Sequence, residues 1–170
     1  MYKICKTEKS IERQELFQLT LLSMMDKYKY QDISVTSLCK EMEIPRKTFY
    51  RYYDTLADVL YSMIDETLSQ SFLCMEVTLD LEGFFTQWKK RKFLLDVLQK
   101  NGISSMMVDR IYKRLGESMH KERFCSDDIR YSASISAIMT MVFTWHHSGM
   151  KQSVEEMSEL AKSLLKFNIK

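Results

Sequence analysis

The stretch of sequence that decides the fold runs from Ile33 to Leu60 and reads ISVTSLCKEMEIPRKTFYRYYDTLADVL. Its first part predicts a helix of about two turns, because apolar residues fall at the i, i+3, i+4 and i+7 positions of one stripe. These residues are Val35, Leu38, Cys39 and Met42. Ser34 comes directly before the stripe and is a suitable N-cap.

The single proline of the chain, Pro45, predicts the start of a second short helix. Its fixed φ suits the first position of a helix, and its ring keeps Ile44 out of the helical region. Residues 42–44 are therefore expected to form a tight turn between the two helices.

The second short helix is expected to have one buried face and one polar face. Phe49 and Tyr53 lie four residues apart and point one way. The remaining surface carries side chains that can all donate hydrogen bonds, namely Arg46, Lys47, Thr48, Tyr50, Arg51 and Tyr52. No acidic residue occurs from Ile44 to Tyr53, so a DNA phosphate backbone is the natural partner of its cations. The alternative is that this face is only a solvated basic surface.

The segment resembles the DNA-binding domain of the tetracycline-repressor (TetR) family of transcription regulators. In that family a Leu-Ala-x-x-Ala-Gly-Val turn leads to a Thr-Phe/Leu-Tyr-x-His-Phe recognition helix. The corresponding stretches here are 38–44 and 48–53. The sequence departs from the family at three places: Met42-Glu43 replaces Ala-Gly, Pro45 replaces a serine cap, and Leu56 replaces a phosphate-binding lysine.

The departure at Glu43 predicts a local cost. Glycine tolerates a positive φ at this turn position, whereas a residue with a Cβ adopts it at a cost on the order of 1 kcal/mol. Together with the loss of a cation at Leu56, this puts the strength of DNA binding in question.

The resemblance implies a set of DNA-contacting residues. Those expected near the DNA backbone at the start of the first short helix are Ser34 and Thr36. Those expected to face bases are Arg46, Lys47, Thr48 and Arg51. Those expected to face phosphates or thymine methyl groups are Tyr50 and Tyr52.

Composition predicts an all-α fold. Four glycines and one proline among 170 residues leave little room for β-turns. The resemblance implies a three-helix helix-turn-helix head, residues 1–54, joined by a long helix to a helical ligand-binding and dimerisation domain, residues 55–170. No apolar run of about 18 residues and no signal peptide are visible, so we expect a cytoplasmic protein without a membrane partner. The net charge of +2 is nearly neutral, so evidence for DNA binding is local.

The cysteines predict neither a metal nor a cofactor. They lack Cys-x-x-Cys spacing and lie far apart, at Cys5, Cys39, Cys74 and Cys125. Reduced thiols are expected, with a zinc site or a redox switch as the disfavoured alternatives. The sequence also has no glycine-rich phosphate loop, Gly-x-Ser-x-Gly elbow or His-Glu-x-x-His helix, which argues against an enzyme.

The rest of the chain predicts further helices. A long helix is expected from Thr55 to Phe72, with Asp58 completing a capping box. Two more are expected at 80–100 and 103–115, separated by Asn101-Gly102, with a loop at 116–127. A last helix is expected to begin at the capping box of residues 153–156.

The helix expected at 132–149 is apolar around almost its whole circumference, which indicates burial on both sides. One side can face its own core and the other needs a second body, so we expect a homodimer. The stretch from Trp145 through Gly149 to the capping box at 153–156 resembles the helix pair that forms the dimer interface in many TetR-family proteins. The interface residues expected are Trp145, His146, Val154, Met157 and Leu164.

The resemblance also implies a small apolar effector among the middle helices. The residues expected to line its site are Trp88, Phe93, Met107, Tyr112, Met139 and Phe143. Core packing explains the same pattern and is favoured over a ligand site. His146 is likewise better explained as an interface histidine than as a pH-sensitive group.

Together with the resemblance, these patterns predict a TetR-like transcription regulator that acts as a repressor. It would bind a near-palindromic double-stranded DNA operator as a homodimer. Its recognition helices would lie about 34–36 Å apart, and an effector would act by shifting the population of this spacing. The alternative is a TetR-like protein-interaction subunit with weakened DNA binding, which Glu43 and Leu56 favour.

Overall fold

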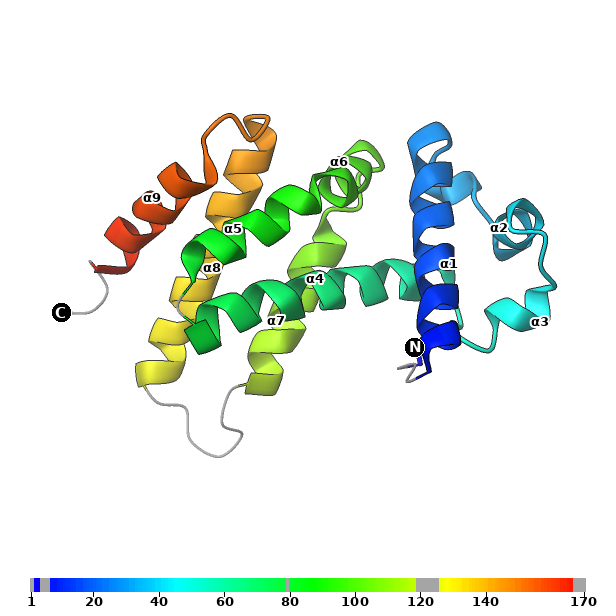
Figure 1. Cartoon of the computed structure of the whole chain (residues 1–170), viewed down its shortest axis with the longest axis horizontal. Helices are drawn as coiled ribbons and strands as arrows, with labels where there is room; N and C mark the ends of the chain where they lie inside the picture. The colour runs from blue at the N-terminus through cyan, green and yellow to red at the C-terminus, as the bar shows by residue number, and fades with distance from the viewer. Residues whose placement is uncertain (1, 4–6, 79, 119–125, 167–170) are drawn as a thin grey trace. The chain divides into compact units, whose positions relative to one another are not determined.

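The computed structural model describes residues 2–3, 7–78, 80–118 and 126–166 (Figure 1). The fold is all-α, as predicted, and these ranges contain no strand. The elements in chain order are α1 (Glu8–Lys27), a 3-10 helix η1 (Tyr30–Asp32), α2 (Val35–Glu41), α3 (Arg46–Phe49), α4 (Leu56–Thr78), α5 (Leu81–Lys90), α6 (Lys92–Lys100), α7 (Ser105–Ser118), α8 (Ser126–His147) and α9 (Val154–Lys166). None of the described helices is both long and apolar enough to cross a bilayer.

Side-chain caps begin the helices where the sequence predicts them. The Ser34 hydroxyl accepts a hydrogen bond of 3.0 Å from the backbone N–H of Ser37 at the start of α2. At the start of α9, the Glu156 N–H donates to the Ser153 hydroxyl at 3.1 Å while the Glu156 carboxylate accepts from the Ser153 N–H at 2.7 Å. Both caps satisfy amides that a helix leaves without partners at its first turn.

Several predicted boundaries are wrong. The second short helix ends at Phe49, so residues 50–53 follow it. The long helix expected to end at Phe72 continues to Thr78, and the helix expected at 132–149 spans Ser126–His147. Pro45 is the N-cap of α3 and not its first helical residue. The expected helix 80–100 is broken at Arg91, inside a run of four cations that gathers at the C-terminal end of α5, where the helix dipole favours them. Residues 116–118 and 126–127 are helical and not loop, because one glycine, Gly116, costs a helix only about 1 kcal/mol. Residues 119–125 lie outside the described part.

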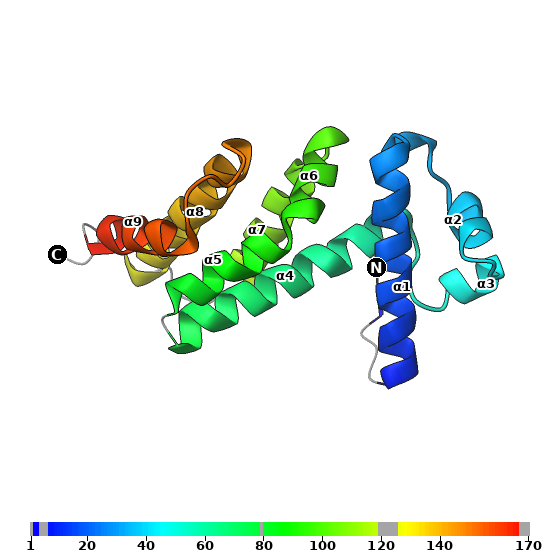
Figure 2. The ribbon, with the colours of Figure 1, turned by 45° about the horizontal axis from the view of Figure 1, so that its top comes forward.

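The chain forms two compact units whose limits differ from the predicted domains. The first unit comprises Met1–Glu66 and Leu94–Met107, and the second comprises Thr67–Phe93 and Val108–Lys170. In the first unit, α2 and α3 lie on the same side of α1 in both views (Figures 1 and 2).

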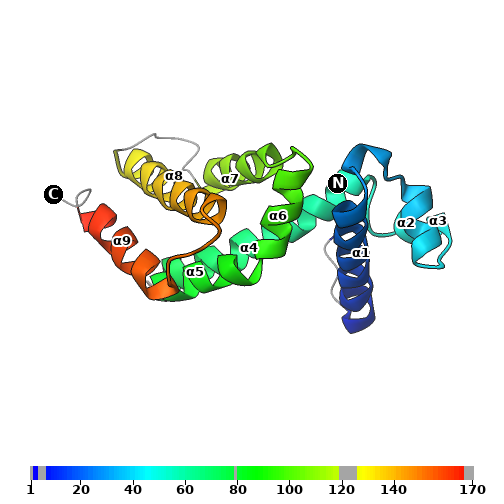
Figure 3. The ribbon, with the colours of Figure 1, turned by 90° about the horizontal axis from the view of Figure 1, so that it is seen from above.

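In the second unit, α5 packs closely along α9, which in turn contacts α8. Figure 3 separates a layer containing α4 and α5 from one containing α7 and α8. One aromatic contact joins these layers: the Phe85 ring of α5 meets the Trp145 ring of α8 edge to face at 5.8 Å. The Trp145 indole N–H donates to the Gln152 carbonyl at 3.2 Å. Trp145 is therefore a core residue of its own chain.

The helix α8 is only partly covered by its own chain. Its buried side chains form one stripe, namely Ile135, Ile138, Met139, Val142 and Trp145. Its other apolar side chains stay half-buried, namely Ala137, Met141 and Phe143. Within a single chain, therefore, only one side of α8 is buried, whereas burial on both sides was predicted.

Candidate nucleic-acid interface

The turn between α2 and α3 is a tight helix ending that requires one left-handed residue. The Ile44 N–H donates to the Cys39 carbonyl at 2.9 Å and the Glu43 N–H donates to the Lys40 carbonyl at 3.1 Å. This is the Schellman pattern, in which the residue after the cap takes a positive φ. Glu43 has φ 52°, which confirms that the left-handed conformation expected at this position is adopted by a residue with a Cβ.

Helix α3 and the residues that follow it are anchored through two aromatic side chains, Phe49 in α3 and Tyr53 after it. Phe49 is fully buried and Tyr53 is 1% exposed. Both rings pack edge to face on Phe17 of α1, with ring centroids 5.5 Å and 5.8 Å apart. The predicted division of this short segment into a buried face and a polar face is confirmed.

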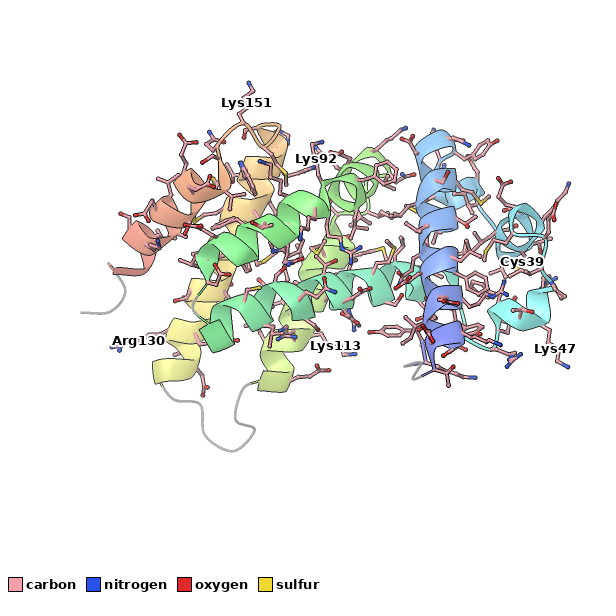
Figure 4. The ribbon with its side chains drawn as sticks, viewed as in Figure 1. Cys39, Lys47, Lys92, Lys113, Arg130 and Lys151 are labelled. Carbon is pink, nitrogen blue, oxygen red and sulfur yellow. The ribbon has the colours of Figure 1, made fainter. Side chains whose placement is uncertain are left out.

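All eight residues predicted to contact DNA reach the surface of the first unit. Six are exposed, namely Ser34, Thr36, Arg46, Lys47, Tyr50 and Arg51, and two are half-buried, namely Thr48 and Tyr52. Figure 4 shows Lys47 pointing away from the ribbon of α3. The structure thus presents an exposed face on the α2–α3 segment that combines cations, hydroxyls and an aromatic ring.

Arg46 lies against Tyr50 on this face. Its guanidinium donates to the Tyr50 hydroxyl at 3.3 Å and lies 5.9 Å from the centre of the ring. The hydrogen bond from this side chain to Tyr50 raises the pKa of Arg46. Two hydrogen-bonding groups are thereby held together at the surface, one a cation and one a hydroxyl.

Tyr52 packs on α1 in a way that the sequence did not predict. Its ring lies 5.8 Å from the Phe17 ring, and its carbonyl accepts a hydrogen bond of 3.0 Å from the Lys3 N–H. Tyr52 is half-buried, so packing accounts for much of its surface. Tyr50 is 44% exposed and is the freer of the two tyrosines.

A buried polar network that no local sequence pattern predicts connects α1 to the first turns of α4. The Gln18 side-chain amide donates to the Ser62 hydroxyl at 3.1 Å, and that hydroxyl donates to the Val59 carbonyl at 2.7 Å. The Tyr53 hydroxyl lies 3.3 Å from the same Ser62 oxygen. Because the Gln18 and Ser62 side chains pair across 44 residues, no local pattern reveals the contact.

The capping box predicted at the start of α4 is confirmed. The Asp58 carboxylate accepts from the Thr55 N–H at 2.9 Å and from its hydroxyl at 3.0 Å. Burial acts to raise the pKa of Asp58, but the hydrogen bonds that the carboxylate accepts, those from Thr55 among them, outweigh burial and hold this pKa below its usual range. Asp58 is therefore a stabilising anion at the first turn of α4.

The predicted effector-site residues do not share one environment. Trp88 and Met139 are buried in the second unit, Phe143 is half-buried there, and Met107 is buried in the first unit. Phe93 and Tyr112 are 48% and 67% exposed. The prediction that these two line an interior site is wrong, because helical spacing alone does not tell which side of an amphipathic helix the fold covers.

The predicted dimer residues divide in a similar way. Trp145 and Met157 are 2% and 5% exposed in the single chain and are not available to a partner. His146 and Val154 are half-buried, and Leu164 is 38% exposed. Leu160, one turn before Leu164 on α9, is 55% exposed. The accessible apolar surface of α9 is therefore at Leu160 and Leu164.

Among the described residues, burial disfavours the reactive thiolate of Cys39. Cys39 is 2% exposed, and burial raises the pKa of its thiol, an effect that nearby Arg46 partly offsets. No group of three or more His, Cys, Asp or Glu side chains that could hold a metal occurs within the described ranges. Cys5 and Cys125 lie outside them.

Comparison with known proteins identifies a solved structure with a similar fold. The chain matches no protein-family model and no curated protein. Among solved structures, it is similar to Lin0861 from Listeria innocua, with a TM-score of 0.64 at 15% sequence identity. The likeness covers 98% of this chain and 96% of that chain. At this identity it shows a shared fold over nearly the whole length.

Proposed function

We propose that this chain is a TetR-type transcription regulator that binds a near-palindromic double-stranded DNA operator. The observation that carries the proposal is the exposed face of the α2–α3 segment. Arg46, Lys47 and Arg51 are exposed on it, and no acidic residue lies between Ile44 and Tyr53. A compact basic segment of this kind, anchored by buried aromatic rings, suits the major groove, where arginine pairs with guanine and hydroxyls hold phosphates.

The supporting geometry is the anchoring of α3. Phe49 and Tyr53 hold it on Phe17, so its polar side chains start from a fixed backbone. A fixed backbone lowers the conformational entropy that is lost when the face meets DNA. Glu43 and Leu56 remain the features that would weaken affinity.

The test is binding of the full chain to labelled DNA that flanks its own coding region, followed by fluorescence anisotropy at several salt concentrations. We expect saturable binding whose affinity falls steeply with salt. Arg51→Ala should weaken it by about 1–3 kcal/mol if Arg51 reads a base. Arg130→Ala is the matched control, because Arg130 is an exposed arginine of α8 (Figure 4). Arg51→Ala and Arg130→Ala having equal effects would contradict the assignment of this face.

The same experiment addresses the rival function, a TetR-like subunit that docks another protein. That function requires no steep dependence on salt. Glu43 favours it, because its exposed carboxylate at the turn before α3 would repel phosphate. Absence of salt-dependent DNA binding by the wild-type chain would favour docking.

The proposal includes a homodimer. Half-buried apolar side chains of α8 and exposed Leu160 and Leu164 of α9 support it, since a second copy is the commonest cover for such surface. A dimer would present two recognition helices to successive major grooves.

The proposal also includes release by a small apolar effector in the second unit. Four buried polar atoms of the described residues support it, because they have no hydrogen-bond partner: Trp88 Nε1, Ser71 Oγ, Ser132 Oγ and Ser158 Oγ. Such atoms are uncommon in folded proteins, and a ligand with an acceptor would satisfy the indole N–H. An effector that raises the melting temperature of the wild-type chain should raise it less in Trp88→Phe. This variant keeps an aromatic side chain but lacks the indole N–H. Equal shifts in both proteins would remove Trp88 from the effector site.

A further inference from the structure

The turn between α6 and α7 belongs to the same compact unit as the helices that carry the candidate DNA-binding face. Leu94–Met107 groups with Met1–Glu66. The turn is a tight helix ending: the Gly102 N–H donates to the Gln99 carbonyl at 3.0 Å and the Ile103 N–H donates to the Leu98 carbonyl at 3.0 Å. Gly102 has φ 68°, the left-handed conformation that this ending requires. The turn therefore fixes the direction of Asn101 just before it.

Asn101 uses its whole side-chain amide to join three backbone segments. Its Oδ1 accepts a hydrogen bond of 2.7 Å from the Tyr30 N–H at the start of η1. Its Nδ2 donates to the Met25 carbonyl of α1 at 3.2 Å and to the Val97 carbonyl of α6 at 2.9 Å. Met25 O belongs to the last turn of α1, where carbonyls have no partner within the helix. Asn101 thus closes the gap between the end of α1 and the start of η1.

A second contact lies beside it and is weaker. Lys100 forms an ion pair with the Asp26 carboxylate at 3.1 Å, and its ammonium group also contacts the Asp26 carbonyl. Both side chains are more than half exposed, at 58% and 54%, so solvent screens the pair. Asn101 and Tyr30 are half-buried, so loss of Asn101 would leave backbone groups without partners in a partly dry site.

We propose that Asn101 is a positioning residue of the DNA-binding unit, acting from the α6–α7 turn through the link between α1 and α2. The link contains η1 and leads directly to Ser34, the N-cap of α2. Without the Asn101 bridge the link loosens, and α2 and α3 sample orientations in which their polar face does not fit the groove. Only the competent fraction binds, so the apparent affinity falls by that fraction. The DNA readout rests on the proposed function.

The first test compares operator affinity in Asn101→Ala with the control Lys100→Gln, in the full chain and at a temperature where both are folded. We expect Asn101→Ala to weaken affinity about tenfold and Lys100→Gln to change it little. The slope of affinity against salt should stay as in wild type, because no phosphate contact is removed. A merely structural role would lower the melting temperature and leave affinity unchanged among folded molecules, and that result would overturn the proposal.

The second test does not depend on DNA. Amide hydrogen exchange should accelerate in Asn101→Ala at Tyr30 and at Ile33, whose N–H donates to the Tyr30 carbonyl at 3.1 Å. The Met150 amide, bonded to the Trp145 carbonyl in the second unit, should exchange as in wild type. Uniform acceleration of all three amides, or of none, would overturn the proposal.

A conservative variant covers the case in which Asn101→Ala does not fold. Asn101→Asp keeps an acceptor for the Tyr30 N–H but cannot donate to Met25. It should protect the Tyr30 amide and still weaken operator binding, by less than Asn101→Ala does where both can be compared. Wild-type affinity in Asn101→Asp, together with unchanged exchange at Ile33, would count against the proposal. If wild type binds no operator at all, the proposed function fails, whereas the exchange pattern still decides the role of Asn101.

Discussion

At the scale of single residues, Glu43 is one of two non-glycine residues in the described ranges that adopt a left-handed backbone conformation, the other being Met150. The φ of 52° at Glu43 is one that glycine adopts without cost and a residue with a Cβ does not. The strain follows from the Schellman ending of α2, which needs a left-handed residue whatever its side chain. Glu43 is exposed, so no packing interaction offsets the strain.

We therefore expect Glu43→Gly to raise the free energy of unfolding by about 1 kcal/mol, measured by urea denaturation. Glu41→Gly is the matched control, because Glu41 is also an exposed glutamate but lies in α2 itself. There glycine should lower the free energy of unfolding by a similar amount. The same sign of change at both positions would contradict the strain at Glu43.

At the scale of helices, the starts of helices that depend on side-chain caps can be predicted from the sequence. The caps at Ser34, Thr55 and Ser153 each pair with a residue three positions on, so their signal is contained in a few adjacent residues. The break at Arg91 was missed because the cation run there has no proline or glycine to mark a helix end. The loop predicted to begin at Gly116 is wrong, because Gly116 lies within α7 and a helix stabilised by tertiary packing tolerates one glycine.

The start of α4 makes a prediction about pH. The folded pKa of Asp58 lies below its usual range, so its ionised form stabilises the fold. This contribution is fully present above the unfolded pKa of about 3.9 and is lost as pH falls through the lower folded pKa. The free energy of unfolding should therefore fall between pH 5 and pH 3 more steeply in wild type than in Asp58→Asn. At pH 7 Asp58→Asn should be less stable by about 1 kcal/mol.

The control for this pH dependence is Glu15→Gln, an exposed carboxyl on α1. Its curve should run parallel to that of wild type. Parallel curves for wild type and Asp58→Asn would mean that the capping box does not account for the acid sensitivity.

At the scale of the whole molecule, the candidate DNA-binding face can be predicted from sequence, but the surroundings of the proposed effector and dimer residues cannot. The face of α3 is set by a short segment with Phe49 and Tyr53 on one side, so periodicity suffices. The exposure of Phe93 and Tyr112 and the burial of Trp145 depend on which helices pack together, which periodicity does not encode. The same holds for the first unit, where Asn101 and Tyr30 meet across 71 residues of sequence.

The proposed dimer gives the prediction that tests the molecule as a whole. Leu160 and Leu164 lie one turn apart on α9 and remain 55% and 38% exposed. If they pack against a second copy, Leu160→Glu with Leu164→Glu would bury unpaired charge at the interface and separate the subunits. Sedimentation should then give a dimer for wild type and a monomer for the double variant.

The control is Leu19→Glu, since Leu19 of α1 is 64% exposed and is not part of the proposed interface. It should stay dimeric. A monomeric double variant should also lose operator affinity, because one head contacts only one half-site and the advantage of simultaneous contact disappears. A wild-type monomer, or a double variant that sediments as a dimer, would remove α9 from the interface. Full operator affinity in a monomeric double variant would instead show that one head is enough.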